Sequence, residues 1–283
     1  MRLKLKAMVA TLLAGLLGVN CTSWAGSSNH LRFQNLESLA RQGNKEALFD
    51  LGVLYANGEG VDQSYARGLK YLWEAALRGY GPAYTNIGLF YYYGLGLNRD
   101  YQKAFSYFEK GAKHDDPQAY YNLAVMLDNG QGVSKNPAQA LAYFEEAARR
   151  QYLPAISSIA CKYLLGLGVE KDEKKAFDLY HDGALRGDVR SQSNLIFMYL
   201  NGVGTPRDVK EAYYWGEKVS HSNDPEGLMN YGVLLEKGYN GSPNVREALA
   251  IYERACELGS KSACEGIKRL QKRYPALNKS PAS

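Results

Sequence analysis

The chain has 283 residues, of which 46% are hydrophobic and 22% are charged, as in an ordinary folded protein rather than a disordered one. Its formal net charge is +5, and residues 1–25 supply three of the positive charges and no negative one. Without that segment 31 basic residues stand against 29 acidic ones. Basic and acidic residues are thus nearly equal in number and the basic ones do not cluster, which argues against a nucleic-acid partner.

The N-terminal segment has the composition of an export signal. A basic start is followed by an apolar run of 13 residues, Ala7–Val19, which is too short to span a bilayer comfortably. Ser23 and Ala25 are small residues at the positions that a signal peptidase reads. We expect a signal peptide over residues 1–25, a mature N-terminus at Gly26 and a periplasmic protein. No later apolar run is long enough to predict a transmembrane helix.

Cys21 offers an alternative, in which the exported chain is anchored through a lipid on this cysteine. Lipoprotein signals usually have leucine three residues before the cysteine, and Gly18 stands there instead. The sequence therefore favours a released periplasmic chain over an anchored one, with secretion from the cell as a further alternative. An exported chain would meet an oxidising compartment, in which disulfides form.

After residue 43 the sequence repeats every 36 residues without an insertion. The marker is a glycine, which stands at Gly58, Gly94, Gly130, Gly166, Gly202 and Gly238. Apolar residues four apart, such as Ala47, Leu51 and Tyr55, precede it and predict one face of a helix. A glycine directly after such a helix is typical of a left-handed C-cap, so we interpret the Gly-x-Gly turn as structural and not as a phosphate loop.

A second helix is predicted after each turn. Residue types that cap helix N-termini share one register, at Ser64, Asp100, Asn136, Asp172, Asp208 and Asn244. Small residues and then larger apolar residues follow, as at Gly68 and Tyr71. Each unit is therefore predicted to consist of helix A, a turn, helix B and a return turn.

The pattern predicts an all-α fold made of helix-turn-helix repeats. The repeats cover residues 44–260, approximately as 44–79, 80–115, 116–151, 152–187, 188–223 and 224–259. Residues 26–43 are predicted to hold a linker and a capping helix from residue 31, and residues 261–274 a C-terminal capping helix. Residues 275–283 are predicted to be a disordered tail.

The repeat resembles the Sel-one-like repeat (SLR) family of α-solenoids. The pattern A-x-x-x-L-G-x-x-Y-x-x-G-x-G-V reads here as Ala47, Leu51, Gly52, Tyr55, Gly58, Gly60 and Val61. The resemblance covers about residues 31–273 and implies a right-handed α-solenoid related to tetratricopeptide repeats. The chain departs from the pattern at Ser191, Gly227, Ile196 and Asn240, so repeats five and six are the least regular.

The cysteines extend the resemblance. Cys256 and Cys264 resemble the pairs of the cysteine-rich branch of this family, in which such pairs join adjacent helices, and this implies a disulfide. The alternative is that they are two small buried residues. Cys161 lies within a helix A, where other repeats have apolar residues, and we interpret it as a packed free thiol.

One polar row suggests a binding surface. It stands directly before the Leu51 register, at Asp50, Asn86, Asn122, Ser158, Asn194 and Asn230. In related helical-repeat solenoids the A helices line the concave groove, where asparagines can hold an extended peptide through both a donor and an acceptor. Tyr93 and Tyr121 add aromatic area beside this row. The alternative is that these polar residues cap local backbone groups or face water.

Catalysis has little support in the sequence. None of the four histidines stands at a metal-ligand spacing from another histidine or a cysteine, and we predict no catalytic, metal-binding or cofactor-binding residue. The resemblance implies a non-enzymatic scaffold that binds another protein, for example an adaptor, a host-interaction factor or an immunity protein against an antibacterial effector such as a type VI lipase. Its alternatives are an enzyme with weak β-lactam-binding or hydrolase activity and a module that binds peptidoglycan or another glycan.

Overall fold

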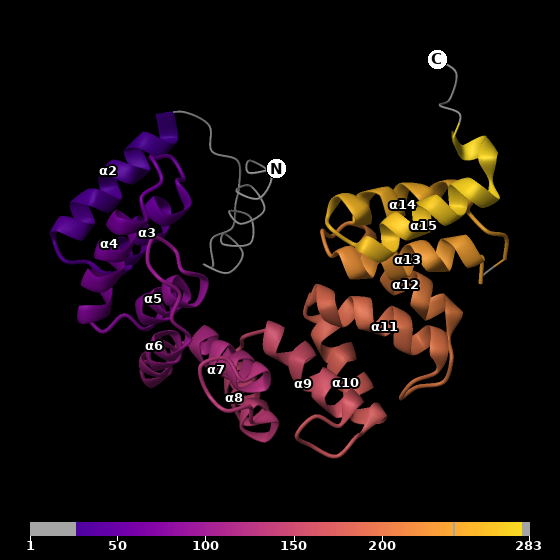
Figure 1. Ribbon diagram of the computed structural model, residues 1–283, viewed down its shortest axis with the longest axis horizontal. Coiled ribbons are helices and arrows are strands. Elements are labelled where there is room, and N and C mark those ends of the chain that lie inside the picture. The colour runs from indigo at the N-terminus through magenta and orange to yellow at the C-terminus, as the bar shows by residue number, and fades with distance from the viewer. Residues whose placement is uncertain (1–26, 240, 279–283) are drawn as a thin grey trace. The chain divides into compact units, whose positions relative to one another are not determined.

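The computed structural model describes residues 27–239 and 241–278, and every regular element in these ranges is a helix (Figure 1). Fourteen α-helices and one short 3-10 helix are present in the described ranges. The predicted signal peptide, the cleavage site before Gly26 and the alternative lipid site at Cys21 lie outside the described residues. The prediction of an all-α fold is confirmed.

Each repeat consists of two α-helices of 12 or 13 residues. The A helices are α3 (Lys45–Asn57), α5 (Gly81–Tyr93), α7 (Pro117–Asn129), α9 (Pro154–Leu165), α11 (Val189–Asn201) and α13 (Pro225–Lys237). The B helices are α4 (Tyr65–Leu77), α6 (Tyr101–Lys113), α8 (Pro137–Arg149), α10 (Glu173–Leu185), α12 (Val209–Ser220) and α14 (Val245–Glu257). Helix α2 (Ser27–Arg41) precedes the repeats, and α15 (Lys261–Arg273) follows them.

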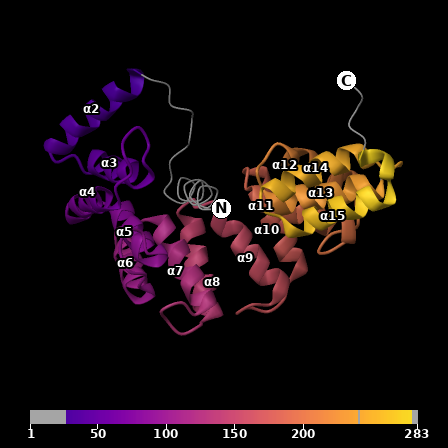
Figure 2. The ribbon, with the colours of Figure 1, turned by 45° about the horizontal axis from the view of Figure 1, so that its top comes forward.

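The chain forms two compact units, unit 1 up to Arg150 and unit 2 from Gln151. Within each unit a helix packs mainly on its neighbours along the chain, so that consecutive helices lie side by side (Figure 2). Some A helices also contact the next A helix, as α5 contacts α7 and α11 contacts α13. Within each unit a repeat thus buries its apolar face against the next one, which is the packing of an α-solenoid.

The helix ends follow from the repeated residues. The glycine after each A helix has a φ angle between 62° and 73°, a left-handed conformation that glycine adopts without a Cβ clash. The residue before each B helix accepts a hydrogen bond from a backbone N–H two or three positions later, as Ser64 Oγ does from Arg67 at 3.3 Å. The turn is therefore a structural cap, as predicted.

The second glycine of the turn contributes to the packing between repeats. A Cβ added at Gly96 would lie 2.5 Å from the Cβ of Tyr65, and one added at Gly204 would lie 2.1 Å from the carbonyl oxygen of Glu173. Tyr65 and Glu173 each begin the helix B of the preceding repeat, 31 residues earlier in the chain. Glycine is required here because the turn lies directly on the backbone or Cβ of the neighbouring repeat.

Facing positions of the A and B helices combine a small residue with a large one. A Cβ added at Gly88 would lie 2.6 Å from the ring of Phe108, its counterpart on helix B. Repeat five reverses the sizes, with buried Ile196 on helix A and Gly216 on helix B. Gly216 in turn leaves room for the ring of Tyr231, which a Cβ there would approach within 2.3 Å. The departure of Ile196 from the family pattern is thus accompanied by a compensating glycine.

Both ends of the array differ from the expectation. Where a linker is expected before residue 31, α2 already begins at Ser27, because no glycine or proline interrupts its sequence up to Arg41. Where a disordered tail is expected, Pro275–Asn278 form a 3-10 helix. Tyr274 and Leu277 pack against the core of unit 2, which explains why this part of the tail is ordered.

Two links hold α15 on the last repeat. Cys256 and Cys264 form a disulfide between the end of α14 and the first turn of α15, with their Cα atoms 4.9 Å apart. Arg269 of α15 donates hydrogen bonds to both carboxylate oxygens of Glu236 on α13, at 3.2 and 2.6 Å. The Tyr252 hydroxyl donates to the same carboxylate at 2.8 Å. Burial alone would raise the pKa of Glu236, but the bonds from Arg269 and Tyr252 hold it below its usual value.

The helices of the described part of the chain are short. None of them combines the length and the apolar composition that crossing a membrane requires.

Candidate interaction site

The predicted polar row occupies one register of the A helices, but its members differ in exposure. Asn86 is only 1% exposed, and its Nδ2 donates to the carbonyl of Pro82 at 3.0 Å. Its Oδ1 is buried without a hydrogen-bond partner among the described residues. Contrary to the expectation, Asn86 does not face an open groove, because its side chain is covered where α5 packs on its neighbours.

Two other members of the row bond within their own helix. Ser158 Oγ donates to the carbonyl of Pro154 at 3.3 Å, and Asn194 Nδ2 donates to the carbonyl of Arg190 at 2.8 Å. These bonds are of the local backbone kind that the sequence leaves open as the alternative. Asp50 is half-buried on α3, and its charge adds to burial in raising the pKa of Tyr80.

Asn230 lies in a wide hollow at the start of α13 and α15. Pro225, Glu226 and Met229 line it from α13, and residues 259–262 line it from the other side. Its volume is about 560 Å³. No other member of the row lines this hollow.

Three predicted residues do meet, in a pocket that we call the α5–α7 pocket. It is lined by Leu89, Tyr92, Tyr93, Phe108, Tyr121, Asn122 and Val125. Helix α5 supplies the first three of these residues, α6 supplies Phe108, and α7 supplies the last three. The cavity measures about 140 Å³ and carries no charged side chain in its lining. Of the predicted partner-binding residues, Tyr93, Tyr121 and Asn122 thus form one site.

The aromatic rings of the α5–α7 pocket are held by further contacts. The Tyr92 hydroxyl donates to Gln131 Oε1 at 2.8 Å, and the rings of Tyr92 and Tyr93 meet edge to face with centroids 4.9 Å apart. On α7 the ring of Tyr121 packs edge to face on Phe144 at 5.3 Å. Tyr93 nevertheless remains 45% exposed. Partial burial, and then the neighbouring tyrosine hydroxyls, raise the pKa of Tyr93, so its phenol stays neutral at physiological pH.

Sequence reasoning did not assign Leu89, Phe108 and Val125 to the site. The repeat register contained a signal for two of them. Leu89 and Val125 share one register, that of Cys161, and both line the pocket together with Asn122 of the polar row. Phe108 is the large residue that faces Gly88, and it closes the floor of the pocket as part of the core. A pocket between successive A helices is visible only once their packing is known.

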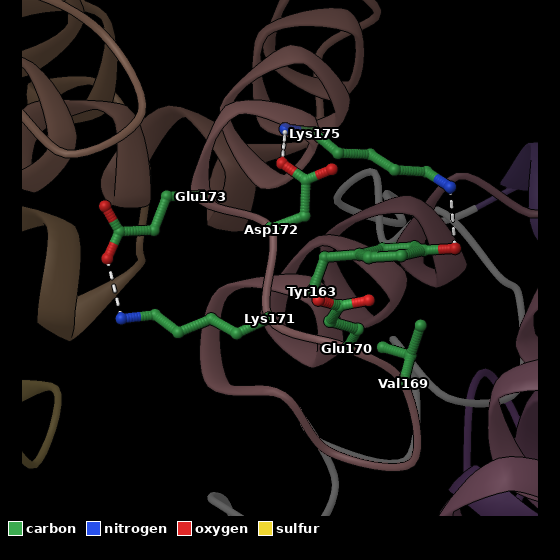
Figure 3. Close-up of a pocket in the computed structure, with 7 residues that line it drawn as sticks. All are labelled: Tyr163, Val169, Glu170, Lys171, Asp172, Glu173 and Lys175. Atoms are coloured by element: carbon green, nitrogen blue, oxygen red, sulfur yellow. Dashed lines mark hydrogen bonds and ion pairs between the residues drawn. The ribbon is translucent and has the colours of Figure 1, made fainter.

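The turn between α9 and α10 forms a second hollow, of about 670 Å³, which Figure 3 shows. Lys175 Nζ donates to the Tyr163 hydroxyl at 2.7 Å, and Lys171 forms an ion pair with Glu173 at 2.7 Å (Figure 3). Its polar side chains thus bond to one another across an open surface. We regard it as a weaker candidate than the α5–α7 pocket.

The histidines and the free cysteine of the described residues do not belong to a metal-binding cluster. No three His, Cys, Asp or Glu side chains of the described residues gather as a metal site would require. His114 stacks on Tyr84 with centroids 5.2 Å apart, and His181 lies on Phe177 at 5.9 Å. These imidazoles pack as aromatic rings. Cys161 is a free, partly buried thiol that packs against the core of unit 2, as expected.

The repeated helix pairs, their glycine caps and the α5–α7 pocket define the class of the protein, an all-α helical-repeat protein of the kind that serves as a scaffold for protein interactions. The chain belongs to the Sel1 repeat family. Six Sel1 repeats match it, over residues 45–80, 81–116, 117–152, 155–188, 191–223 and 225–260. The resemblance found in the sequence is thereby confirmed.

Solved structures show the same fold. A Sel1 repeat protein from Oxalobacter formigenes is 25% identical with a TM-score of 0.71, and the match covers 81% of this chain and 97% of that one. A protective antigen of uropathogenic Escherichia coli with an SLR fold is 26% identical with a TM-score of 0.67 over 84% of this chain. This chain spans about half, 51%, of the length of that antigen.

A third structure has a similar fold at lower identity. It is an immunity protein from Pseudomonas aeruginosa, 17% identical with a TM-score of 0.54, and the match covers 82% of this chain and 87% of that one. At this identity the likeness concerns the fold alone. No curated protein sequence matches the chain significantly.

Proposed function

We propose that the chain is a non-enzymatic scaffold that acts in the periplasm after export and binds another protein through the A helices of unit 1. The α5–α7 pocket carries this proposal, because it joins a cavity to a tyrosine that is 45% exposed. Tyrosine is a frequent anchor of protein interfaces, and such anchors fill or flank pockets. No carboxylate, imidazole or thiol lines the pocket, which favours binding over hydrolysis.

The distribution of charge supports the same surface. Helix α5 has no charged residue and α7 has only Asp128, whereas α6 alone carries four, Lys103, Glu109, Lys110 and Lys113. Interface centres are depleted in charged residues and enriched in tyrosine. Helix α6 therefore has the composition of a solvated surface, and α5 and α7 have that of an interface.

The partner that we propose first is an antibacterial effector, which would make the chain an immunity protein. The support is the shared fold with the Pseudomonas aeruginosa immunity protein. An adaptor role on another envelope protein uses the same surface. A β-lactam-hydrolysing enzyme and a glycan-binding module remain the alternatives from the sequence, and neither is favoured by the uncharged lining of the α5–α7 pocket.

The test places a photo-crosslinking benzoylphenylalanine at Tyr93 in the exported chain. Tyr214 on α12 is the matched control, because it is a tyrosine of nearly equal exposure, 47%, on a B helix. We expect one defined protein to be crosslinked at position 93 and not at position 214. Crosslinking at position 214 alone would contradict the proposal.

A separate measurement tests export. The intact mass of the exported chain should correspond to a start at Gly26, and a lipid on Cys21 would contradict release.

A further inference from the structure

We infer that the α5–α7 pocket receives one neutral side chain of about the size of benzene from the partner, and that an adjacent main-chain carbonyl of the partner accepts a hydrogen bond from Asn122. This inference rests on the proposed function and specifies what the partner presents. A segment with phenylalanine, leucine or methionine at this point fits, whereas alanine, tryptophan or a charged residue does not.

The size of the occupant follows from the cavity. The pocket measures about 140 Å³. A cavity of about 150 Å³ with an apolar lining holds one benzene molecule. Alanine would leave most of the space empty, and the indole of tryptophan exceeds it. The floor cannot recede, because Phe108 is 1% exposed and packed against α5 at Gly88.

The occupant is neutral because nothing in the lining compensates a charge. Phe108, Val125 and Leu89 are apolar, and the pocket has neither a carboxylate nor a basic group. A charged group that enters such a site loses its hydration without an ion-pair partner. The tyrosine rings could attract a cation by their faces, and a cationic probe therefore belongs in the test.

Asn122 supplies the polar contact. Its Nδ2 is buried and has no hydrogen-bond partner among the described residues, although Asn122 itself lines the pocket. An unpaired buried N–H is unfavourable, and a partner carbonyl would relieve this cost. The terminal torsion of asparagine is broad, so the amide can turn toward the pocket at little cost. This gives the occupant an acceptor next to its apolar group, as a peptide has.

The test uses the mature chain labelled with ¹⁵N and the probe N-acetyl-phenylalaninamide. The side-chain amide signal of Asn122, assigned by its loss in Asn122→Asp, should shift in a saturable way, with a Kd on the order of 1 mM for so small a ligand. N-acetyl-alaninamide, N-acetyl-lysinamide and N-acetyl-tryptophanamide should each bind at least about 10-fold more weakly. Equal binding of the lysine probe or of the tryptophan probe would overturn the inference.

A pocket-filling variant gives the matched comparison. Val125→Phe places in repeat three the residue that repeat five already has in this register, Phe197, so the helix is expected to tolerate it. The variant should abolish binding of the phenylalanine probe, and Val233→Phe, in the same register of unit 2, should leave it unchanged. If Val125→Phe fails to fold, Tyr93→Ala takes its place, since that side chain is 45% exposed. Unchanged probe binding in a folded variant would overturn the inference.

The two proposals fail separately. A crosslinked partner whose affinity Val125→Phe does not change would overturn the pocket inference and leave the scaffold proposal intact. Specific probe binding without any protein crosslinked at position 93 would support the pocket and count against the scaffold.

Discussion

At the residue scale, Tyr93 combines high exposure with a place in the α5–α7 pocket, so a substitution should affect binding without affecting stability. Tyr93→Ala should weaken the affinity for the partner by about 2 kcal/mol, the usual effect of removing a central aromatic anchor. The free energy of unfolding should change by less than about 0.5 kcal/mol, because the side chain is 45% exposed. Calorimetry with the crosslinked partner and circular-dichroism melts measure the two effects.

Asn86 and Tyr214 are the comparisons for this prediction. Asn86→Ala removes a side chain that is 1% exposed, so its effect should appear in the melting temperature and not in the affinity. Tyr214→Ala removes a tyrosine of nearly equal exposure on a B helix and should change neither the melting temperature nor the affinity. A partner affinity that depends on Tyr214 and not on Tyr93 would place the interface on the B helices.

Also at the residue scale, Glu236 should make the stability of the last repeat dependent on pH. Its pKa is lowered in the folded chain by the bonds from Arg269 and Tyr252, which outweigh burial. A lowered pKa contributes stability that is complete above the unfolded value of about 4.3 and is lost as the pH falls through the folded value. Glu236→Gln should destabilise the chain by about 1.5–3 kcal/mol at pH 7 and by less at pH 3.

Urea unfolding of wild type and variant between pH 7 and pH 3 provides the measurement. Asp116 provides a contrast in the same chain. Burial raises its pKa, so its contribution to stability changes with pH in the opposite direction. The stability associated with Asp116 is present at low pH and is lost as the pH rises through the raised value. A constant difference between wild type and Glu236→Gln at every pH would contradict the assignment of the acid slope to Glu236.

At the element scale, the disulfide should stabilise the attachment of α15. Cys256 and Cys264 are eight residues apart, and closing so short a loop contributes about 2.5 kcal/mol in the chain-entropy account. The double variant Cys256→Ser and Cys264→Ser should lose this amount in denaturant melts. A reductant should destabilise the wild type and Cys161→Ser alike and leave the double variant unchanged. A reductant without effect on the wild type would show that the bond contributes nothing.

The two glycines of one turn should differ in their sensitivity to substitution. Gly204→Ala places a Cβ 2.1 Å from the carbonyl oxygen of Glu173 and should cost about 2–4 kcal/mol, because the backbone of the neighbouring repeat must move. Gly202→Ala meets no atom nearer than 3.4 Å, so it should cost only the roughly 1–2 kcal/mol of the left-handed conformation. Urea unfolding of the two variants measures the difference, and equal losses would contradict the role of Gly204 between repeats.

Local rules were sufficient for the helices and their ends. The spacing of Leu51 and Tyr55 predicts helix A, and Gly58 and Ser64 mark where one helix ends and the next begins. These rules depend on residues that are close together in the chain, so they can be read from the sequence. The close contact of Gly204 with Glu173 joins two repeats, and no single repeat reveals it.

The candidate site was predicted only in part, for the same physical reason. The register identified Asn122, Tyr93 and Tyr121, which meet in the α5–α7 pocket. It also identified Asn86, which is buried. Residues in one register differ in burial because the side chains of the adjacent helices differ from repeat to repeat. Exposure depends on side chains from three helices, and a periodic pattern does not specify it.

At the scale of the whole molecule, the surface that α5 and α7 share stands out because it is nearly free of charged residues. Helix α5 has no charged residue, so partner binding there should depend little on ionic strength. The Kd measured by calorimetry should change by less than about 3-fold between 50 and 500 mM NaCl. A steep loss of affinity with salt would place the partner on the charged B helices.

The second glycine of a turn contacts the first residue of the helix B that begins 31 residues earlier. This contact also limits how the gene of a repeat protein can change in length. Duplication or loss of a whole 36-residue unit inside the array restores the same offset, so a glycine again meets the start of the preceding helix B, as Gly96, Gly132 and Gly204 do now. An insertion of any other length within this interval would set a residue with a side chain against Tyr65, Tyr101 or Glu173. Inheritance should therefore add and remove complete repeats, while new partners are acquired through substitutions on the A helices.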